Sequence, residues 1–246
     1  MHDEDESQPK DFLGRKLSKM RTVYFRFGTR IIGATGRASD HCHPNILRLQ
    51  IHKTFLGLAT QVLISLFPMV LTSRVQNKFP EWCLPEKIVL KIEKDHWEEE
   101  FETEKAAYDK LVRLQGDVIP RCYGQIEYDG KRALILSDIG GAFLATPDGV
   151  VLDENDLRLL LDKALTSLTD YQVSHYDTKL DNFHLVTKNG KDRIMVIDLE
   201  MVDMDLTEGY AFAAKSSASF LIQQYRLHLC TMEYDEVLLP KRPLKA

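Results

Sequence analysis

Three polar side chains in one stretch of the chain have the types and the spacing of a magnesium site. Asp177 and Asn182 lie five residues apart, and Asp198 ends a later apolar run. Between them the chain reads as an apolar strand, a tight turn at Asn189-Gly190 and a second apolar strand. This pattern predicts a β-hairpin that brings the three side chains near one point. Their oxygens suit Mg²⁺ together with phosphate oxygens, and one acid would remain to orient a hydroxyl group. The plainer interpretation is that these acids only cap the hairpin.

The segment His175-Tyr-Asp177-Thr-Lys179-Leu-Asp-Asn182 resembles the catalytic loop of protein kinases, H-R-D-x-K-x-x-N. Asp198-Leu199-Glu200 resembles their D-F-G motif. Two positions differ from the family. Tyr176 replaces an arginine that in many protein kinases pairs with a phosphorylated activation loop, and Glu200 replaces glycine. With Glu200, the motif resembles the D-x-D/E pair of small-molecule kinases of the aminoglycoside and choline type. The class of acceptor substrate is therefore left open.

The resemblance implies a role for each matching residue. Asp177 would orient the attacking hydroxyl group, and Lys179 would neutralise charge on the transferring phosphoryl group. Asn182 and Asp198 would bind Mg²⁺. His175 most often braces backbone in this family, which implies a structural role.

A lysine and a glutamate upstream resemble the pair that places the α- and β-phosphates of ATP. Lys91 lies in a β-branched strand, in the manner of V-A-I-K, and a lysine among apolar neighbours needs a counter-ion. The segment 97–111 predicts a helix with Phe101 and Tyr108 on one stripe and Glu104 beside them. Glu104 therefore resembles the αC glutamate. The alternative is that both residues are ordinary surface charges.

Two further segments complete the expected nucleotide site. The resemblance implies that the hairpin around Gly57, within the strand-rich segment 47–64, covers the phosphates. It also implies that Asp138 and Ile139, in Ser137-Asp-Ile-Gly-Gly141, form the hinge whose backbone binds adenine. A strand stopped by two glycines would explain the hinge residues equally well.

The remaining patterns predict supporting elements. Asp129-Gly130 lies between two strand-like runs and favours a type I′ hairpin turn. Asp153 can cap a helix with a leucine stripe from Leu157 to Leu168. A last amphipathic helix is expected over 216–234, and its predicted apolar contacts are Phe220, Leu221, Tyr225, Leu227 and Leu229.

Composition is that of a globular protein with one or two lobes: 246 residues, 44% hydrophobic, 28% charged. A net charge of −5 gives no general reason to bind nucleic acid or an anionic membrane. The acidic opening is not a secretory signal. The uncharged run 54–73 is long enough to span a bilayer, which would make the chain a membrane-anchored protein, but polar residues interrupt it and favour buried strands. Four cysteines, far apart, favour reduced thiols and a cytoplasmic or nuclear location.

These observations predict an α+β, protein-kinase-like two-lobe fold. Residues 1–45 are expected to be a disordered or loosely ordered extension, 46–139 a β-rich N-lobe and 140–246 a shortened helical C-lobe. The resemblance covers residues 47–205. Within the family it is similar to small divergent kinase-like proteins of fungi, through Pro-Arg-x-Tyr-Gly and Leu-Asp-Asn-Phe segments.

The function implied is an ATP-dependent phosphotransferase with ATP and Mg²⁺ as cofactors and a protein or small-molecule hydroxyl acceptor. The alternative is a pseudokinase that binds nucleotide or a protein without phosphoryl transfer. The chain after Glu200 is short for a protein kinase and has no Ala-Pro-Glu motif. A protein partner could therefore complete the C-lobe.

Overall fold

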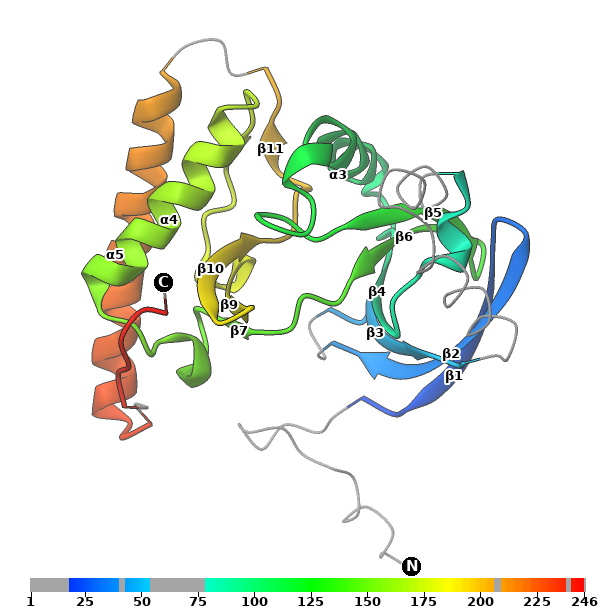
Figure 1. The fold of residues 1–246 in the computed structure, drawn as a ribbon, viewed down its shortest axis with the longest axis horizontal. Coiled ribbons are helices and arrows are strands. Elements are labelled where there is room, and N and C mark those ends of the chain that lie inside the picture. Colours follow the sequence, from blue (N-terminus) through cyan, green and yellow to red (C-terminus); the bar gives the residue numbers. More distant parts are fainter. Residues whose placement is uncertain (1–17, 40–42, 54–77, 206–208, 238–239, 246) are drawn as a thin grey trace, which may run out of the picture. The chain divides into compact units, whose positions relative to one another are not determined.

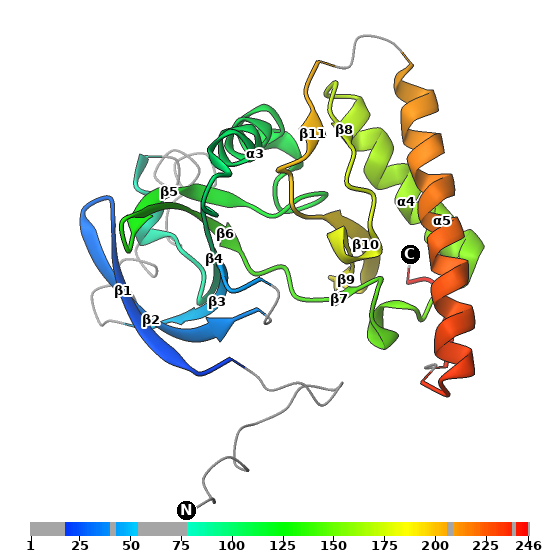
Figure 2. The same ribbon diagram turned by 180° about the vertical axis from the view of Figure 1, so that it is seen from behind.

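The computed structural model describes residues 18–39, 43–53, 78–205, 209–237 and 240–245. They group into two compact units. Unit 1 contains Met1–His96 and Cys122–Asp138, and unit 2 contains Trp97–Arg121 and Ile139–Ala246. Unit 1 is β-rich and unit 2 is the helical part, so the predicted α+β class is confirmed (Figure 1, Figure 2).

Unit 1 is built on one antiparallel sheet with the strand order β1-β2-β3-β4-β6-β5. Its elements are β1 (Arg21–Phe27), β2 (Arg30–Ala38), β3 (Ile46–Ile51), the short helix η1 (Pro80–Trp82), β4 (Lys87–Ile92), β5 (Cys122–Tyr128) and β6 (Lys131–Ser137). The turn at Asp129-Gly130 has positive φ at both residues, as the predicted type I′ hairpin requires.

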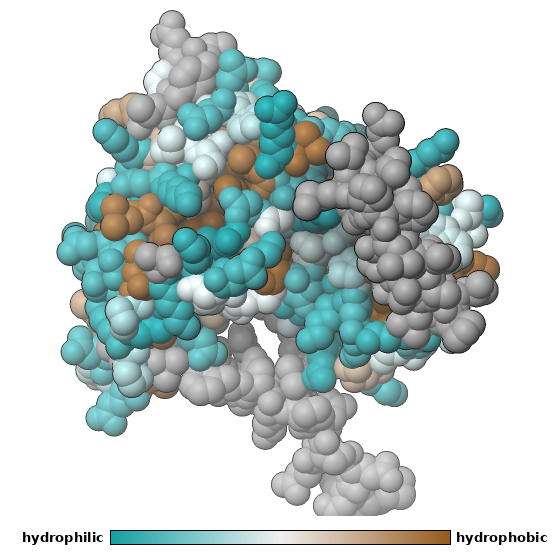
Figure 3. Space-filling view, in the orientation of Figure 1, coloured by the Kyte–Doolittle hydropathy of each residue, from teal (hydrophilic) through white to brown (hydrophobic). Residues whose placement is uncertain are grey.

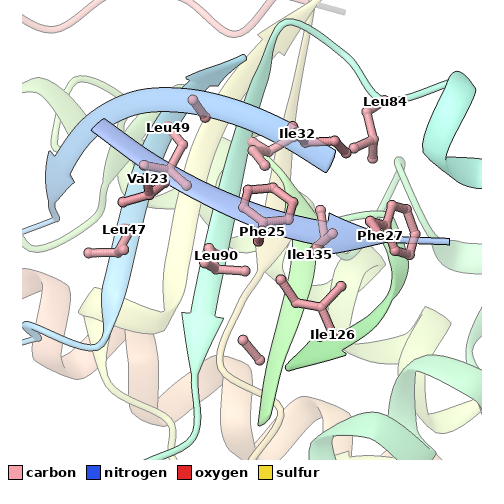
Figure 4. Close-up of a cluster of buried hydrophobic side chains, with 13 residues drawn as sticks. Val23, Phe25, Phe27, Ile32, Leu47, Leu49, Leu84, Leu90, Ile126 and Ile135 are labelled. Carbon is pink, nitrogen blue, oxygen red and sulfur yellow. The ribbon is translucent and has the colours of Figure 1, made fainter. Parts of the chain in front are cut away.

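The sheet curls around a core of aliphatic and aromatic side chains (Figure 4). In β1, Val23, Phe25 and Phe27 are buried while the residues between them are exposed, since alternate side chains of a strand point to opposite faces. The core continues through Leu90 of β4 and Ile135 of β6. Strand β4, which carries Lys91, lies between β3 and β6 in the sheet.

The prediction of a loosely ordered extension over residues 1–45 is wrong where the structure describes it, because β1 and β2 are two strands of the sheet. Arginines on the exposed face obscured the alternation of β1. The glycines of β2 suggested a linker, but Gly36 is needed for close packing. A Cβ atom there would lie 1.9 Å from the backbone oxygen of Arg48 in β3.

Unit 2 joins two long helices to small strands. Its elements are α3 (Glu98–Lys110), η2 (Val112–Leu114), β7 (Ala142–Phe143), η3 (Pro147–Gly149), α4 (Glu154–Thr169), β8 (Ser174–His175), η4 (Leu180–Asn182), β9 (Phe183–Lys188), β10 (Lys191–Val196), β11 (Val202–Asp203) and α5 (Tyr210–Tyr234). Strands β10, β9 and β7 form one sheet, and β11 pairs with β8. Helix α4 packs against α5 and β10.

The predicted helices are present, with one correction. Asp153 caps α4 by accepting from the N–H groups of Asn155 and Asp156 at 2.8 and 3.0 Å. In α5, however, Phe220 and Leu227 are exposed and do not supply the predicted core contacts. The buried stripe consists of Ala214, Ala218, Leu221, Ile222, Tyr225 and Met232. Apolar residues on both faces of the helix made the sequence pattern ambiguous.

The sequence predicts an N-lobe over 46–139, which includes α3. In the structure, residues 97–121 group with unit 2 instead. Contacts with the later chain explain this grouping: the Lys110 ammonium donates to the carbonyl oxygen of Met204, and the Val196 N–H donates to that of Val118 at 2.7 Å. Gly57 and the whole run 54–73 lie outside the described residues. Within the described residues, no helix combines the length and the apolar character needed to cross a membrane.

Candidate active site

The β9–β10 hairpin is formed as predicted and positions the residues on either side of it. Its two strands pair from Phe183 opposite Val196 to Lys188 opposite Lys191. The turn at Asn189-Gly190 has positive φ at both residues. Beyond the last pair, the N–H of Ile197 donates to the carbonyl oxygen of Asn182 at 2.9 Å. The residue before β9 is therefore joined directly to the residue before Asp198.

Asp177, Lys179 and Asn182 form one hydrogen-bonded group. The Asn182 amide nitrogen donates to the backbone oxygen of Asp177 at 2.9 Å and to its Oδ2 at 3.0 Å. The Lys179 ammonium lies 2.8 Å from Asp177 Oδ1, and this hydrogen-bonded carboxylate raises the pKa of Lys179. Because the amide nitrogen of Asn182 is used in both bonds, its Oδ1 is the atom left to bind a cation.

His175 braces the chain at Asp198, as the family resemblance implied. The ring is buried, and its Nε2 donates to the carbonyl oxygens of Ile197 at 3.2 Å and Asp198 at 3.0 Å. Burial lowers the pKa of His175, because a charged imidazole loses its hydration there, and these two hydrogen bonds oppose the shift only partly. A neutral ring with the proton on Nε2 therefore holds the backbone that carries Asp198.

Asp198 lies in a left-handed backbone conformation, with φ of 59°, among other acids. One carboxylate oxygen from each of Glu104, Asp198 and Glu200 lies within 4.8 Å of the others. Glu104 comes from the buried stripe of α3, with 1% of its surface exposed, which confirms that it points inward. Three carboxylate oxygens this close together could serve as ligands of one divalent cation.

The donor set of this cluster is chemically suited to magnesium. Carboxylate and amide oxygens are hard ligands, which favour Mg²⁺, Ca²⁺ or Mn²⁺ over the metals that prefer sulfur or imidazole. The acids that lie together in the structure are Glu104, Asp198 and Glu200. Binding of Mg²⁺ by Asn182 with Asp198 stays a prediction. Bound magnesium would supply positive charge to phosphate oxygens.

Sequence reasoning missed the contacts by which α5 and β11 support the loop from His175 to Asn182. The Gln224 amide donates to the carbonyl oxygen of Thr178 at 2.9 Å. The Tyr176 hydroxyl donates to Asp203 at 3.0 Å, and the Asp205 N–H together with this hydroxyl lowers the pKa of Asp203. A glutamine in a helix 46 residues away gives no pattern that could have predicted the first contact.

Lys91, which the sequence predicts to bind the phosphates, belongs to unit 1. Lys91 is buried, with 5% of its surface exposed, between Ile46 of β3 and Leu134 of β6 in the sheet register. The interpretation of Lys91 as a surface charge is therefore wrong. Its pairing with Glu104 stays a prediction, because the two residues belong to different units.

The predicted hinge lies where the chain passes from one unit to the other, between Asp138 and Ile139. The Asp138 carboxylate is 3.2 Å from the Arg48 guanidinium in unit 1. Within unit 2, the carbonyl oxygen of Gly140 accepts from the buried ring of His184 at 3.1 Å. Each side of the junction is thus tied to its own unit. Binding of adenine by Asp138 and Ile139 stays a prediction.

Comparison with solved structures finds the kinase domain of Mycobacterium tuberculosis PknI, solved as a double mutant. The TM-score is 0.47 and the sequence identity 13%, over 77% of this chain and 72% of that chain. No protein-family model matches the chain, and no curated protein matches it. An identity of 13% does not bear on activity, and the narrower resemblance to fungal proteins stays a prediction.

Proposed function

We propose that this chain is an ATP-dependent phosphotransferase that transfers the γ-phosphoryl group of ATP to a hydroxyl acceptor and uses Mg²⁺. The observation that carries the proposal is the hydrogen-bonded group of Asp177, Lys179 and Asn182, joined through backbone to Asp198. It combines an acid for the acceptor, a cation for the phosphoryl oxygens and oxygen ligands for a metal.

Each residue has a distinct task in this mechanism. Asp177 accepts a hydrogen bond from the acceptor hydroxyl and takes its proton as the oxygen attacks. Lys179, whose pKa is raised by Asp177, stays protonated and stabilises the charge that spreads over the phosphoryl oxygens. Asn182 holds the Asp177 carboxylate in position through its amide nitrogen. Lys91 and Glu104 are proposed to place the α- and β-phosphates.

The direct test is Asp177→Asn, which keeps the size of the side chain but removes the base. We expect the rate of ADP formation to fall by about 10²- to 10⁴-fold, the usual contribution of a general base. Binding of Mg·ATP, measured by thermal shift, should be retained. Asp181→Asn is the matched control, because Asp181 lies in the same loop with an exposed side chain. Equal rates in the Asp177 variant and wild type would refute the assignment of Asp177.

The second candidate is a module that binds nucleotide or a protein partner without phosphoryl transfer. It is favoured by the short connection after the site, since only eleven residues, 199–209, separate Asp198 from α5. Protein kinases use this part of the chain to bind the acceptor. A wild-type chain that gains thermal stability with Mg·ATP but forms no ADP with any acceptor would support this candidate instead.

A further inference from the structure

Unit 2 contains a cavity that is separate from the candidate active site. It has a volume of about 250 Å³ and lies between helix α4, strand β10, residues 117–118 and the segment 240–245. Its described lining residues include none of those predicted to bind ATP, Mg²⁺ or the acceptor. Figure 3, which has the orientation of Figure 1, shows hydrophobic residues surrounded by hydrophilic ones on the face of unit 2 that carries α4.

The inner wall of the cavity is apolar. The buried side chains that line it are hydrophobic except for that of Asp192, whose charge is paired with Arg242. The hydrophobic ones are Val118, Ala164 and Ile194. The wall therefore offers apolar surface that a ligand side chain could cover, and its one buried acid is already neutralised.

Four cationic side chains surround this apolar wall. Lys163, Lys191 and Lys245 are exposed, and their ammonium groups have no ion-pair or hydrogen-bond partner among the residues that the structure describes. The fourth, Arg193, is paired with Asp117. Because the whole chain carries a net charge of −5, this excess of positive charge is local. Such a rim attracts an anionic ligand.

The backbone edge of β10 also faces the cavity. Strand β10 lies at one end of the described sheet β10-β9-β7. On its outer edge the Asp192 N–H donates to the carbonyl oxygen of Lys245 and the Val196 N–H to that of Val118, both at 2.7 Å. Backbone groups alternate sides along a strand, so those of Ile194 face the same edge between these two bonds. Ile194 lines the cavity, and an extended peptide can add to such an edge.

We propose that this cavity is the docking site for an acidic peptide segment of a partner protein, which inserts one apolar side chain between α4 and β10. The carboxylates of the peptide pair with the three lysines, and the apolar side chain covers the inner wall. The volume suits a side chain better than a nucleotide, since sites for ligands of that size usually measure about 300–1,000 Å³. A free phosphate ion would leave the apolar wall uncovered. The proposal does not depend on phosphoryl transfer, because the cavity lies outside the candidate active site.

Fluorescence polarisation with the full chain tests the charged part of the site. The probe is a fluorescein-labelled peptide with one leucine between three aspartates on each side. We expect Lys163→Glu to weaken binding on the order of tenfold, because it replaces an attraction with a repulsion. Lys215→Glu is the matched control, since Lys215 is also an exposed lysine on a helix, α5, and lies outside the cavity. Circular dichroism should show the same helix content in both variants. Absence of binding at millimolar peptide, or equal losses in the two variants, would overturn the proposal.

A second peptide, with asparagine in place of leucine, tests the apolar part of the site. We expect it to bind wild type about tenfold more weakly, because asparagine gains little from covering an apolar wall. Equal affinity of the two peptides would refute an inserted apolar side chain. Inorganic phosphate and phosphatidylserine vesicles are the competing ligands. If either binds with the same dependence on Lys163 while the leucine peptide does not bind, the cavity is a site for a free anion or a membrane surface, and the peptide assignment is wrong.

Discussion

The two hairpins, β5–β6 and β9–β10, share one local design but have different surroundings. Each turns through two residues with positive φ, Asp129-Gly130 in one and Asn189-Gly190 in the other. Each is followed within two residues by an acid, Asp138 or Asp198. Asp138 lies beside the Arg48 guanidinium, whereas Asp198 lies beside two further carboxylates. Local sequence sets the hairpin, and tertiary neighbours decide whether an arginine or further carboxylates lie beside its acid.

The second rung of each hairpin differs in the same way. Glu127 pairs with Arg132 across β5–β6 and is exposed. Thr187 pairs with Asp192 across β9–β10, and the Asp192 side chain is fully buried. The carboxylate accepts hydrogen bonds from Nη1 and Nη2 of Arg242, at 2.6 and 3.0 Å, and from the Lys245 N–H at 2.9 Å. The second hairpin is therefore joined to the C-terminal segment of the chain.

The largest expected effect is on activity. Asp198→Asn removes a carboxylate from the acidic cluster, and we expect the Mg²⁺-dependent rate of ADP formation to fall on the order of 10³-fold. Glu127→Gln, on the other hairpin and exposed, should leave the rate unchanged. Steady-state assays over a magnesium titration measure both. A full rate for Asp198→Asn would show that the two hairpins do not differ in function.

The next effect is on stability. Asp192→Asn leaves the Arg242 guanidinium without its buried counter-charge, and we expect a loss of about 3 kcal/mol in the free energy of unfolding. Glu127→Gln should change it by less than about 0.5 kcal/mol, because Glu127 is exposed and surface substitutions contribute little. Urea denaturation followed by circular dichroism gives both values. Similar losses in the two variants would contradict the contrast between the rungs.

Acid should act on the second hairpin through Asp192. Burial alone would raise the pKa of this carboxyl, but Arg242, Thr187 and the Lys245 N–H outweigh burial and lower it to about 2. Because the folded pKa lies below the ordinary value of 3.8, the stabilisation is complete above pH 3.8 and is lost as the pH falls towards 2. It amounts to about 2 kcal/mol. The difference in urea midpoint between wild type and Asp192→Asn should be smaller at pH 3 than at pH 5 and smallest near pH 2. A difference that does not change with pH would contradict this role of Asp192.

The smallest expected effect is one that the hairpins share. Gly130→Ala and Gly190→Ala each force a side chain into φ above 70°, with no atom near enough to clash. We expect each variant to lose about 1 kcal/mol of stability. Thermal unfolding of the two proteins in parallel measures the losses. A much larger loss at Gly190 would mean that the second turn is constrained by more than its own backbone.

Much of the local structure was predictable because it depends on neighbours in sequence. Two-residue turns with Asn-Gly or Asp-Gly, the Asp153 cap and the inward direction of Glu104 each follow from a few adjacent residues. The strands β1 and β2 were missed because their pairing with β3 is what buries them. In α5, periodicity alone did not distinguish the core face from the exposed face.

The sequence by itself determined the order of the candidate residues, the hairpin between Asn182 and Asp198, and the residue types that suit magnesium and phosphate. Only the tertiary structure decided that Glu200 joins Glu104 and Asp198, that Gln224 supports the loop at Thr178, and that Arg242 neutralises Asp192. Hairpins and caps are closed by hydrogen bonds over a few residues. These other contacts join residues 46 or more apart or require α3 to fold back, and such pairings leave no periodic trace in the chain.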